Sequence, residues 1–551
     1  MTTKRVYLET FGCQMNELDS ELVAGSLSSL GYRFTPDADE ADIVLYNTCS
    51  VRERAEQKVW SRLGELNIAK KDRPGLVVGV LGCMAERDGT DLMARMPVVD
   101  LMCGPAELDK LPELLDNAVR TRGALAADDP SGAGDGSGRR VALQGGASRR
   151  SSTLAAAGDS LESLDLGRMV SPIDTDGRRS AYVRITRGCN KFCTYCVVPH
   201  TRGAEIHRPP NHIIDEIKAL ADQGVIEITL LGQTVNHYRF EHGASVEVGG
   251  VVQPQKGRTY KGSHNRDALA GADTTTFADL LWRIHEEVPA IERLRFVTSY
   301  PRDFGDDVLE VIRACPRICR YIHVPAQTGS DRMLKKMNRG YTIAQYDEFV
   351  DRCRSFLDQP EIGRPLMLSG DIIVGFPTET DGDHEATKRL LERARYKNCF
   401  IFKYSPRPGT VAYDRIPDDI PDEIKRARNN ELLAIQARVT GEITRAQVGR
   451  EFDVFIEGLS RREHKKRGTD VKPGSGMVGI TVNGAKAAAP VAMLDGDDPG
   501  ETVQYAGRTD GDMIVHLDAP ASASEMIGSI VRARITDADR GSLRGEVLGR
   551  G

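Results

Sequence analysis

Six short apolar runs, separated by helix-like stretches, fill the middle of the sequence between Ala181 and Tyr404 and limit the folds open to the chain. Each run ends in a turn rich in glycine, proline or polar residues, such as "GQTVN", "SYPRD", "PAQTGS", "GFPTE" and "SPRPGT". Strands that alternate with helices form parallel sheets, and in β/α barrels the turns after the strands build the mouth of the active site. We therefore predict a partial (β/α)6 barrel, with strands that begin near Ala181, Glu227, Arg293, Arg320, Leu366 and Cys399.

The regions on either side of the predicted barrel have different patterns. In the N-terminal region, the strand-like runs "RVYLETFGC", "ADIVLYNTC" and "GLVVGVLGC" alternate with helical stretches, which predicts a doubly wound parallel sheet. The C-terminal region contains short runs such as "REFDVFIEG" and "IGSIVRARIT", which are typical of a small antiparallel β-barrel of about five strands. A chain of 551 residues also favours roughly three domains. We place these domains at residues 1–123, 179–446 and 447–551.

Three segments interrupt this domain plan. Residues 124–178 are rich in Gly, Ser and Ala and contain no aromatic residue up to Ser180, so we expect a flexible linker there. Residues 241–276 form an insertion longer than usual barrel connections, and we expect it to be mobile. The insertion at residues 460–500 carries "RREHKKRG", which is either a basic arm that contacts phosphate or a solvated run of charges.

Charge and cysteine content narrow the class of protein. The net charge of -6 excludes a uniformly basic nucleic-acid binder, although a local basic surface remains possible. The sequence has no apolar run long enough to cross a bilayer and begins without a leader-like segment, so we expect a cytoplasmic protein that binds no membrane. Eleven cysteines in this length are too sparse for a disulfide framework, and clustered thiols in a reducing compartment more often hold metal.

One cysteine cluster directly follows the first predicted barrel strand. The stretch "GCNKFCTYC" places Cys189, Cys193 and Cys196 in one turn, and thiolates are the ligands that iron–sulfur clusters use. A zinc site or three structural cysteines is the alternative, although zinc normally takes four closed ligands. No fourth cysteine or histidine stands at a matching interval nearby, unless His200 is counted. We therefore predict an iron–sulfur cluster with one iron left open.

A second set of three cysteines lies in the N-terminal region. Cys13, Cys49 and Cys83 each follow an apolar strand of the predicted parallel sheet. The carboxyl ends of such strands open onto one crevice, so these three residues are expected to meet there and to leave one iron of a second cluster open. Three buried thiols without a ligand role are the alternative.

The barrel motif "RGCNKFCTYCVVPHTRG" resembles the cluster loop of the radical S-adenosylmethionine enzymes. In that family the methionine part of S-adenosylmethionine chelates the open iron, and reductive cleavage gives a 5′-deoxyadenosyl radical. The resemblance implies that Tyr195 contacts the adenine of the cofactor. It also implies that Gly232 and Gln233 in "LLGQTVN" belong to the cofactor-binding turn, and that Gly375 in "DIIVGFPTET" lets the backbone approach the cofactor.

The motifs "FGCQMNELDSE", "NTCSVRERAEQKV", "GVLGCMAE", "PAQTGSDRMLKKMNRGYT" and "KYSPRPGT" extend this resemblance to the methylthiotransferases. That family implies two [4Fe–4S] clusters, and S-adenosylmethionine as both methyl donor and radical source. It implies insertion of a methylthio group at carbon 2 of N6-isopentenyladenosine at position 37 of tRNA, beside the anticodon, and a TRAM-like barrel that binds the RNA. An electron donor such as a flavodoxin or ferredoxin and a sulfur source are further implied partners.

Two other functions remain open from the sequence. A methylthiotransferase could instead modify threonylcarbamoyladenosine of tRNA or an aspartate of a ribosomal protein. The alternative of another class is a non-catalytic iron–sulfur protein that binds RNA and senses redox state. Such a protein would need no cofactor pocket, so the presence of the cofactor motifs argues against it.

Several other residues have two interpretations. His323 either meets substrate or cofactor at the mouth or is a satisfied core histidine. Arg202 and Glu205 in "HTRGAE" either position cofactor or RNA or form a surface ion pair. We expect structural burial for the remaining cysteines, Cys103, Cys315, Cys319, Cys353 and Cys399.

Overall fold

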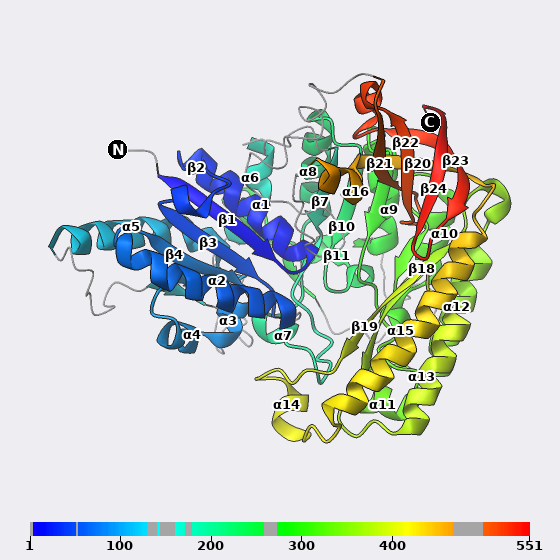
Figure 1. The fold of residues 1–551 in the computed structure, drawn as a ribbon, viewed down its shortest axis with the longest axis horizontal. Coiled ribbons are helices and arrows are strands. Elements are labelled where there is room, and N and C mark those ends of the chain that lie inside the picture. Colours follow the sequence, from blue (N-terminus) through cyan, green and yellow to red (C-terminus); the bar gives the residue numbers. More distant parts are fainter. Residues whose placement is uncertain are drawn as a thin grey trace.

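The structure is a computed structural model that describes residues 4–50, 53–128, 140–143, 160–170, 179–257, 273–467 and 500–550. It contains an N-terminal sheet domain, an open β/α barrel and a small closed C-terminal barrel (Figure 1). The α/β class and this three-part architecture agree with the sequence prediction. Within the described residues, none of the helices combines the length and the apolar character needed to cross a bilayer.

The N-terminal domain is a doubly wound parallel sheet, as predicted. Its strands run in the order β2-β1-β3-β4-β5-β6, so the chain reverses its direction of growth between β1 and β3. One face packs on α1, α5 and α6 through Val23, Leu27 and Leu115, and the other packs on α2, α3 and α4 through Leu63, Met84 and Leu92. The strands are β1 (Arg5–Phe11), β2 (Arg33–Phe34), β3 (Ile43–Thr48), β4 (Val77–Gly82), β5 (Leu101–Cys103) and β6 (Arg140–Ala142). The helices are α1 (Gln14–Ser29), α2 (Glu53–Asp72), α3 (Cys83–Asp88), α4 (Thr90–Arg95), α5 (Leu111–Asp128) and α6 (Ser160–Val170).

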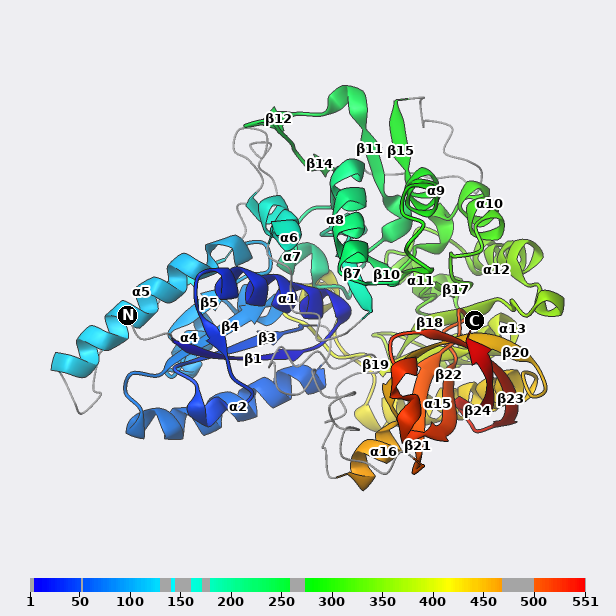
Figure 2. The same ribbon diagram turned by 90° about the horizontal axis from the view of Figure 1, so that it is seen from above.

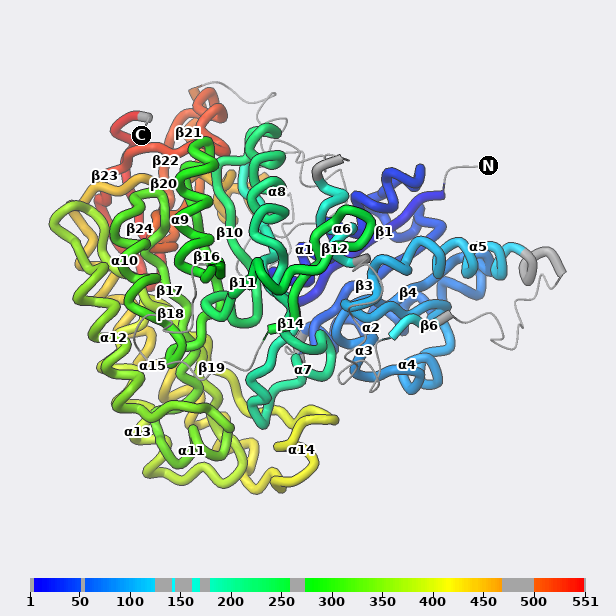
Figure 3. Tube along the Cα trace, turned by 180° about the vertical axis from the view of Figure 1, so that it is seen from behind, coloured from blue at the N-terminus to red at the C-terminus, as the bar shows by residue number. Residues whose placement is uncertain are grey.

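The barrel contains the six predicted strands as two three-stranded parallel sheets, β16-β10-β7 and β17-β18-β19. A parallel bridge between Leu294 and Ile318 links the two sheets. The strands are β7 (Ser180–Arg184), β10 (Glu227–Leu231), β16 (Arg293–Phe296), β17 (Tyr321–His323), β18 (Met367–Val374) and β19 (Asn398–Lys403). Their outer face is covered by α8 (Pro210–Asp222), α9 (Phe277–Glu287), α10 (Asp306–Ala314), α12 (Ile343–Leu357), α13 (Asp381–Ala394) and α15 (Asp422–Arg445) (Figure 3).

The C-terminal barrel closes in the order β20-β21-β22-β24-β23 around an apolar core that includes Phe452, Tyr505 and Leu543. Its strands are β20 (Glu451–Leu459), β21 (Thr502–Arg508), β22 (Ile514–Pro520), β23 (Ile530–Ala538) and β24 (Ser542–Arg550). It packs against the beginnings of the β/α-barrel strands, where Arg293 Nη1 donates to the carbonyl of Arg508 at 2.7 Å. The C-terminal barrel therefore closes the end of the β/α barrel opposite the turns that follow the strands.

Two of the expected irregular segments contain regular structure. The predicted flexible linker includes β6 and α6, and Ser160–Val170 is therefore not a flexible linker. Helix α6 is held because its buried charges are paired: Glu162 accepts from Arg208 Nε at 2.9 Å, and Arg168 Nη1 donates to Glu216 at 3.0 Å. Sequence composition over a wide window hides such a short helix, whose stabilisation comes from partners far along the chain.

The insertion at residues 241–276 is likewise partly ordered. It begins at the end of β11 (Arg239–Glu241) and contains β12 (Glu247–Val248), β13 (Val251–Val252), β14 (Gln255–Lys256) and β15 (Thr274–Thr276). Strand β14 pairs with β9 (Ile206–His207), which itself pairs with β8 (Thr186–Arg187) just before the barrel cysteines. Residues 258–272 of this insertion and residues 468–499 of the third segment lie outside the described residues. The described start of "RREHKKRG" is the short helix α16 (Arg461–Lys466), where Lys466 pairs with Glu501 at 2.8 Å.

Candidate active site

The three N-terminal cysteines follow three adjacent strands at one edge of the sheet. Phe11 pairs with Thr48 and Thr48 with Gly82, so Cys49 and Cys83 begin the next row beyond the paired strand ends. Neighbouring strands lie about 4.8 Å apart, and these cysteine backbones are therefore close together. Gly12 makes the approach possible: it has a φ of 136°, and a Cβ there would lie 2.3 Å from the Cβ of Cys49. The structure thus brings the predicted set together at the β1/β3 reversal, where ligands bind in doubly wound sheets.

A buried polar network fixes the beginning of α1 beside these cysteines. Cys13 Sγ donates to Asn16 Oδ1 at 3.3 Å, and Asn16 Nδ2 donates to Asn47 Oδ1 at 3.0 Å. Asn47 is the residue before last in β3 and also donates to Ser20 Oγ at 2.9 Å. Burial raises the pKa of the Cys83 thiol, while the positive charge of Arg202 acts in the opposite direction.

The barrel cysteines lie in the loop between β8 and the short helix α7 (Val198–Thr201). The loop turns tightly, since the Cys196 amide donates to the Cys193 carbonyl at 3.0 Å. Gly188 is needed at its start because its φ is 68° and a Cβ would lie 2.0 Å from the Ala204 carbonyl oxygen. Burial raises the pKa of Cys189 to about 11. Burial and then the charges of Cys193 and Cys189 raise the pKa of Cys196.

Both cysteine sets have the donor chemistry of iron–sulfur clusters. All six thiols are free of disulfides, and four of them, Cys49, Cys83, Cys189 and Cys193, are buried. Among the described residues, no group of three His, Cys, Asp or Glu side chains converges to hold a single metal ion. A four-iron cluster does not require such convergence, because each cysteine binds a different iron. Closely spaced thiolates repel one another, and bound iron relieves this repulsion. The residues therefore fit a cluster at each set.

Arg202 lies between the two cysteine sets. It follows α7 in the barrel, yet its Nη2 donates to Asp19 Oδ2 at 2.8 Å and to Asn16 Oδ1 at 3.2 Å, both on α1. Its side chain is only 5% exposed. The alternative of a surface ion pair between Arg202 and Glu205 is therefore wrong, because both side chains are buried and Glu205 instead faces His237 and His207.

A second contact joins the N-terminal domain to the far side of the barrel mouth. Arg407, in the turn after β19, forms an ion pair with Glu56 on α2. Glu56 also pairs with Arg87 on α3 at 2.9 Å. These contacts join the N-terminal domain to the turn after the last barrel strand, and Figure 2 shows this domain beside the barrel.

Cationic side chains gather around Tyr300 beside the barrel cysteines. Arg339 Nη1 lies 3.5 Å from Cys193 Sγ, and its guanidinium is 4.6 Å from the Tyr300 ring centroid. Lys191 Nζ is 4.1 Å from the same centroid and donates to Asp303 Oδ2 at 2.5 Å. Sequence reasoning missed Arg339 and Asp303, although Asp303 lies in the predicted mouth turn "SYPRD" and Arg339 lies in the motif "PAQTGSDRMLKKMNRGYT".

The four residues predicted to contact the cofactor differ in their burial and in their neighbours. Tyr195 packs beside the apolar cluster of Met333, Met337 and Phe376, and it is half-buried next to Cys196. Gln233 is half-buried in the turn after β10. Gly232 and Gly375 have packing reasons for lacking a side chain, because a Cβ would lie 2.6 Å from Thr186 Oγ1 and 2.3 Å from Lys425 Cγ, respectively.

Other candidate residues also have defined places. His323 lies at the end of β17, with Nδ1 at 2.9 Å from Ser369 Oγ and Nε2 at 3.3 Å from Asp371 Oδ2. The cysteines expected to be structural are all buried: Cys103, Cys315, Cys319, Cys353 and Cys399.

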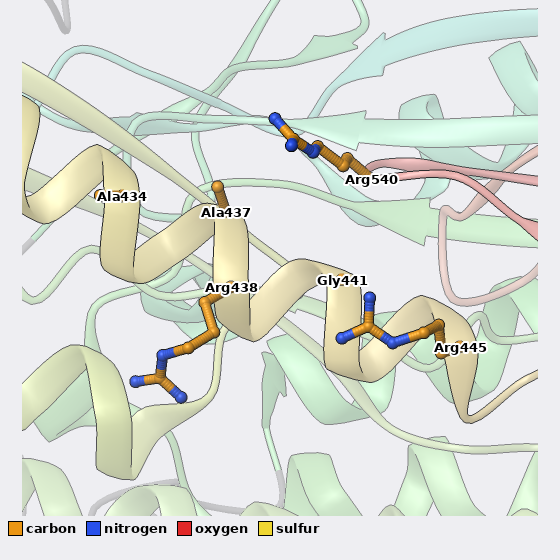
Figure 4. Close-up of a pocket in the computed structure, with 6 residues that line it drawn as sticks. All are labelled: Ala434, Ala437, Arg438, Gly441, Arg445 and Arg540. Atoms are coloured by element: carbon orange, nitrogen blue, oxygen red, sulfur yellow. The ribbon is translucent and has the colours of Figure 1, made fainter.

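A basic groove lies away from the cysteine edge, between α15 and the C-terminal barrel (Figure 4). Its volume is about 370 Å³, and Arg438, Arg445 and Arg540 line it around a strip of small residues on α15. Arg540 reaches it from the turn between β23 and β24, so the groove joins two of the three domains.

Comparison with known proteins gives matches over both cysteine-bearing regions. Residues 5–104 match the uncharacterized protein family UPF0004, and residues 183–391 match the radical SAM superfamily. A relative from Rhodopirellula baltica, named tRNA-2-methylthio-N(6)-dimethylallyladenosine synthase, is 42% identical over 84% of this chain and 85% of its own length. A relative of the same name from Burkholderia mallei is 35% identical over 99% of this chain and 97% of its own length.

Among solved structures, the chain is similar to the radical S-adenosylmethionine methyltransferase TsrM from Kitasatospora setae, with cobalamin and a [4Fe–4S] cluster bound. It is 15% identical and covers 75% of this chain and 77% of its own, with a TM-score of 0.45.

Proposed function

Because this chain belongs to the tRNA-2-methylthio-N(6)-dimethylallyladenosine synthase family, we infer that it adds a methylthio group to carbon 2 of N6-dimethylallyladenosine in tRNA. It is a radical S-adenosylmethionine methylthiotransferase, and its target is position 37, beside the anticodon. The observation that supports this function is the pair of three-cysteine sets, in two domains that are joined by the contacts of Arg202 with Asp19 and of Arg407 with Glu56.

The enzyme uses two [4Fe–4S] clusters and S-adenosylmethionine. Cys189, Cys193 and Cys196 would hold one cluster, and Cys13, Cys49 and Cys83 would hold the other. When bound, these groups supply radical chemistry at an unreactive C–H bond, together with the sulfur and methyl that are transferred. Three protein ligands at each cluster leave a corner for a small molecule.

The chain's own residues hold the two cysteine sets in position and bind the cofactor. Arg202 holds the first turn of α1 against α7, which fixes the spacing between the cysteine sets. Arg339 places a positive charge beside Cys193 and opposes the negative charge of the thiolates there. Tyr195, Gly232, Gln233 and Gly375 are proposed to contact the cofactor when it binds beside the barrel cysteines.

The three proposed domains divide the work. Residues 1–123 carry the N-terminal cysteines, residues 179–446 form the barrel, and residues 447–551 form a TRAM-like RNA-binding barrel. The groove lined by Arg438, Arg445 and Arg540 offers positive charge for tRNA phosphates, which dominate the affinity of nucleic-acid binding. An electron donor such as a flavodoxin or ferredoxin and a separate sulfur source would serve the enzyme in the cytoplasm.

The position of the C-terminal barrel affects how the RNA must lie. The C-terminal barrel packs at the beginnings of the β/α-barrel strands. The cysteines lie beyond the carboxyl ends of the strands in their own domains. Strand β18 alone spans roughly 25 Å at about 3.3 Å per residue. A tRNA that contacts both must therefore extend along the side of the barrel, so that its anticodon loop reaches the mouth.

The test is anaerobic reconstitution followed by nucleoside analysis of an anticodon stem-loop that contains N6-dimethylallyladenosine. The wild-type protein should give the 2-methylthio product and 5′-deoxyadenosine. Cys13→Ala should retain 5′-deoxyadenosine formation but lose the product, whereas Cys193→Ala should lose both. Product formation by Cys13→Ala at the wild-type rate would refute the proposed role of the N-terminal set.

A further inference from the structure

Two exposed phenylalanines lie inside the barrel on its last strand. Phe400 and Phe402 are 45% and 43% exposed, although both belong to β19. They are two residues apart, so they share one face of the strand. Their rings are stacked, with centroids 6.4 Å apart and an interplanar angle of 14°. Exposed and ordered aromatic pairs of this kind commonly mark a binding surface.

Strand register shows which face these rings occupy. Asp371 pairs with Phe400 and Ile373 pairs with Phe402. The residues that alternate with them, Ile372, Cys399 and Ile401, belong to or pack against the core between the strands and the outer helices. Phe400, Phe402 and Asp371 therefore face the interior of the barrel. Ile373 continues this face towards the cluster of Met333, Met337 and Phe376, which also contacts Tyr195.

His323 and Asp371 add a polar edge to this surface. The His323 ring meets the Phe400 ring at 64°, with centroids 6.4 Å apart. His323 Nε2 lies 3.3 Å from Asp371 Oδ2, and the Asp371 side chain remains 25% exposed. We call His323, Asp371, Phe400 and Phe402 the inner strip. It combines an apolar aromatic wall with a carboxylate that accepts hydrogen bonds.

The inner strip is reachable from the side of the barrel. Within the described residues, β19 is the terminal strand of the sheet β17-β18-β19. In both views β19 lies on the side of the barrel nearest the N-terminal domain (Figures 1 and 2). A base that enters beside β19 can therefore reach the exposed rings of Phe400 and Phe402.

We propose that the inner strip receives the substituted N6 edge of the target adenine and selects the dimethylallyl group. Phe400 and Phe402 contact the branched apolar substituent, and Asp371 accepts from the N6–H. This assignment rests on the proposed function and names the residues that set its substrate preference. A threonylcarbamoyl substituent carries its own carboxylate, which Asp371 repels and which the aromatic wall cannot solvate.

The preference for one substituent can be measured with three anticodon stem-loops on the reconstituted holoenzyme. They carry N6-dimethylallyladenosine, unmodified adenosine or threonylcarbamoyladenosine at the target position. Dissociation constants and kcat/KM for methylthio product formation are compared for Phe400→Ala, Phe400→Leu, Asp371→Asn and the wild type. Trp282→Ala is the matched control, because Trp282 is 46% exposed on α9 at the outer surface.

Phe400→Ala should lower the preference for dimethylallyl over unmodified adenosine by roughly tenfold, the scale on which apolar pockets discriminate. Phe400→Leu should restore part of this preference, since it keeps an apolar contact. Asp371→Asn should raise kcat/KM for the threonylcarbamoyl stem-loop by roughly tenfold relative to the dimethylallyl one. Trp282→Ala should leave both ratios at the wild-type values.

Two results would overturn the inference while leaving the proposed function intact. The first is an active wild type whose substrate ratios are unchanged in Phe400→Ala, Phe400→Leu and Asp371→Asn. The second is weaker binding of S-adenosylmethionine with unchanged substrate ratios, which would assign the strip to the cofactor. If the wild type forms no methylthio product from any stem-loop, the proposed function fails, and the inference fails with it.

Discussion

Replacing Arg202 by methionine tests the contact that joins the two cysteine sets. The substitution removes a charge-assisted hydrogen bond to Asp19 at 2.8 Å and a second bond to Asn16 at 3.2 Å. A hydrogen bond to a charged group contributes about 1.5–3 kcal/mol. Asp19 remains paired with Arg184 at 3.2 Å in the variant, so no unpaired buried charge is created. Methionine also preserves part of the apolar packing. We therefore expect Arg202→Met to lower the free energy of unfolding of the N-terminal domain by about 3 kcal/mol.

The chain offers a direct reporter for this measurement. It has two tryptophans, Trp60 on α2 of the N-terminal domain and Trp282 on α9 of the barrel. In a Trp282→Phe background, urea unfolding of the metal-free protein followed by Trp60 fluorescence reports the N-terminal domain alone. With a urea slope of about 2 kcal/mol per molar, the midpoint should fall by about 1.5 M.

The matched control for Arg202→Met is Arg120→Met, at a surface site of the N-terminal domain. Arg120 is 76% exposed and pairs with Asp116 at 2.8 Å, and such surface pairs contribute about 1 kcal/mol or less. A midpoint for Arg202→Met that falls no further than that of Arg120→Met would refute the reasoning, because the buried contact would then add nothing to the domain interface.

Two further predictions concern acid stability and the cluster loop. Burial alone would raise the pKa of Glu162, but Arg208 and His212 outweigh it and lower the pKa to about 2. The lowered pKa stabilises the fold above about pH 4.5, and this contribution of roughly 3 kcal/mol is lost as the pH falls towards 2. Unfolding free energies between pH 5 and 2 should therefore decline less steeply for Glu162→Gln than for the wild type; equal slopes would contradict the pairing. The Gly188→Ala protein should lose about four of its irons, because a Cβ at this position meets the Ala204 carbonyl. Gly224→Ala is the control and should keep all the irons, because Gly224 has a φ of 91° but lies in open space. Iron analysis of the two variants checks this, and full iron retention by Gly188→Ala would contradict the loop geometry.

The order of strands and helices could be predicted from local pattern alone. The six barrel strands begin within a residue or two of the predicted positions, because each is a short apolar run followed by a glycine-, proline- or polar-rich turn. The N-terminal cysteines could also be grouped from local pattern, because each follows a predicted parallel strand. Residues that follow parallel strands lie at one edge of a sheet, so Cys49 and Cys83 meet despite their separation in sequence.

Contacts between domains were beyond the reach of local pattern. Helix α6 lies in a stretch of low-complexity composition, and its buried charges are stabilised by Arg208 and Glu216 of the barrel. Arg202 looked like a surface residue, because its partner Asp19 is 183 positions away in the chain. The inner strip also needed strand register, since Phe400 and Asp371 become neighbours only when β19 pairs with β18.

Iron and sulfide counting on anaerobically reconstituted protein tests the two-cluster account most directly. The wild type should hold about eight irons per chain, Cys13→Ala and Cys193→Ala about four each, and the double variant close to none. A Cys13→Ala protein that still holds about eight irons, or a wild type that saturates near four, would contradict the assignment of a separate cluster to each set of three cysteines.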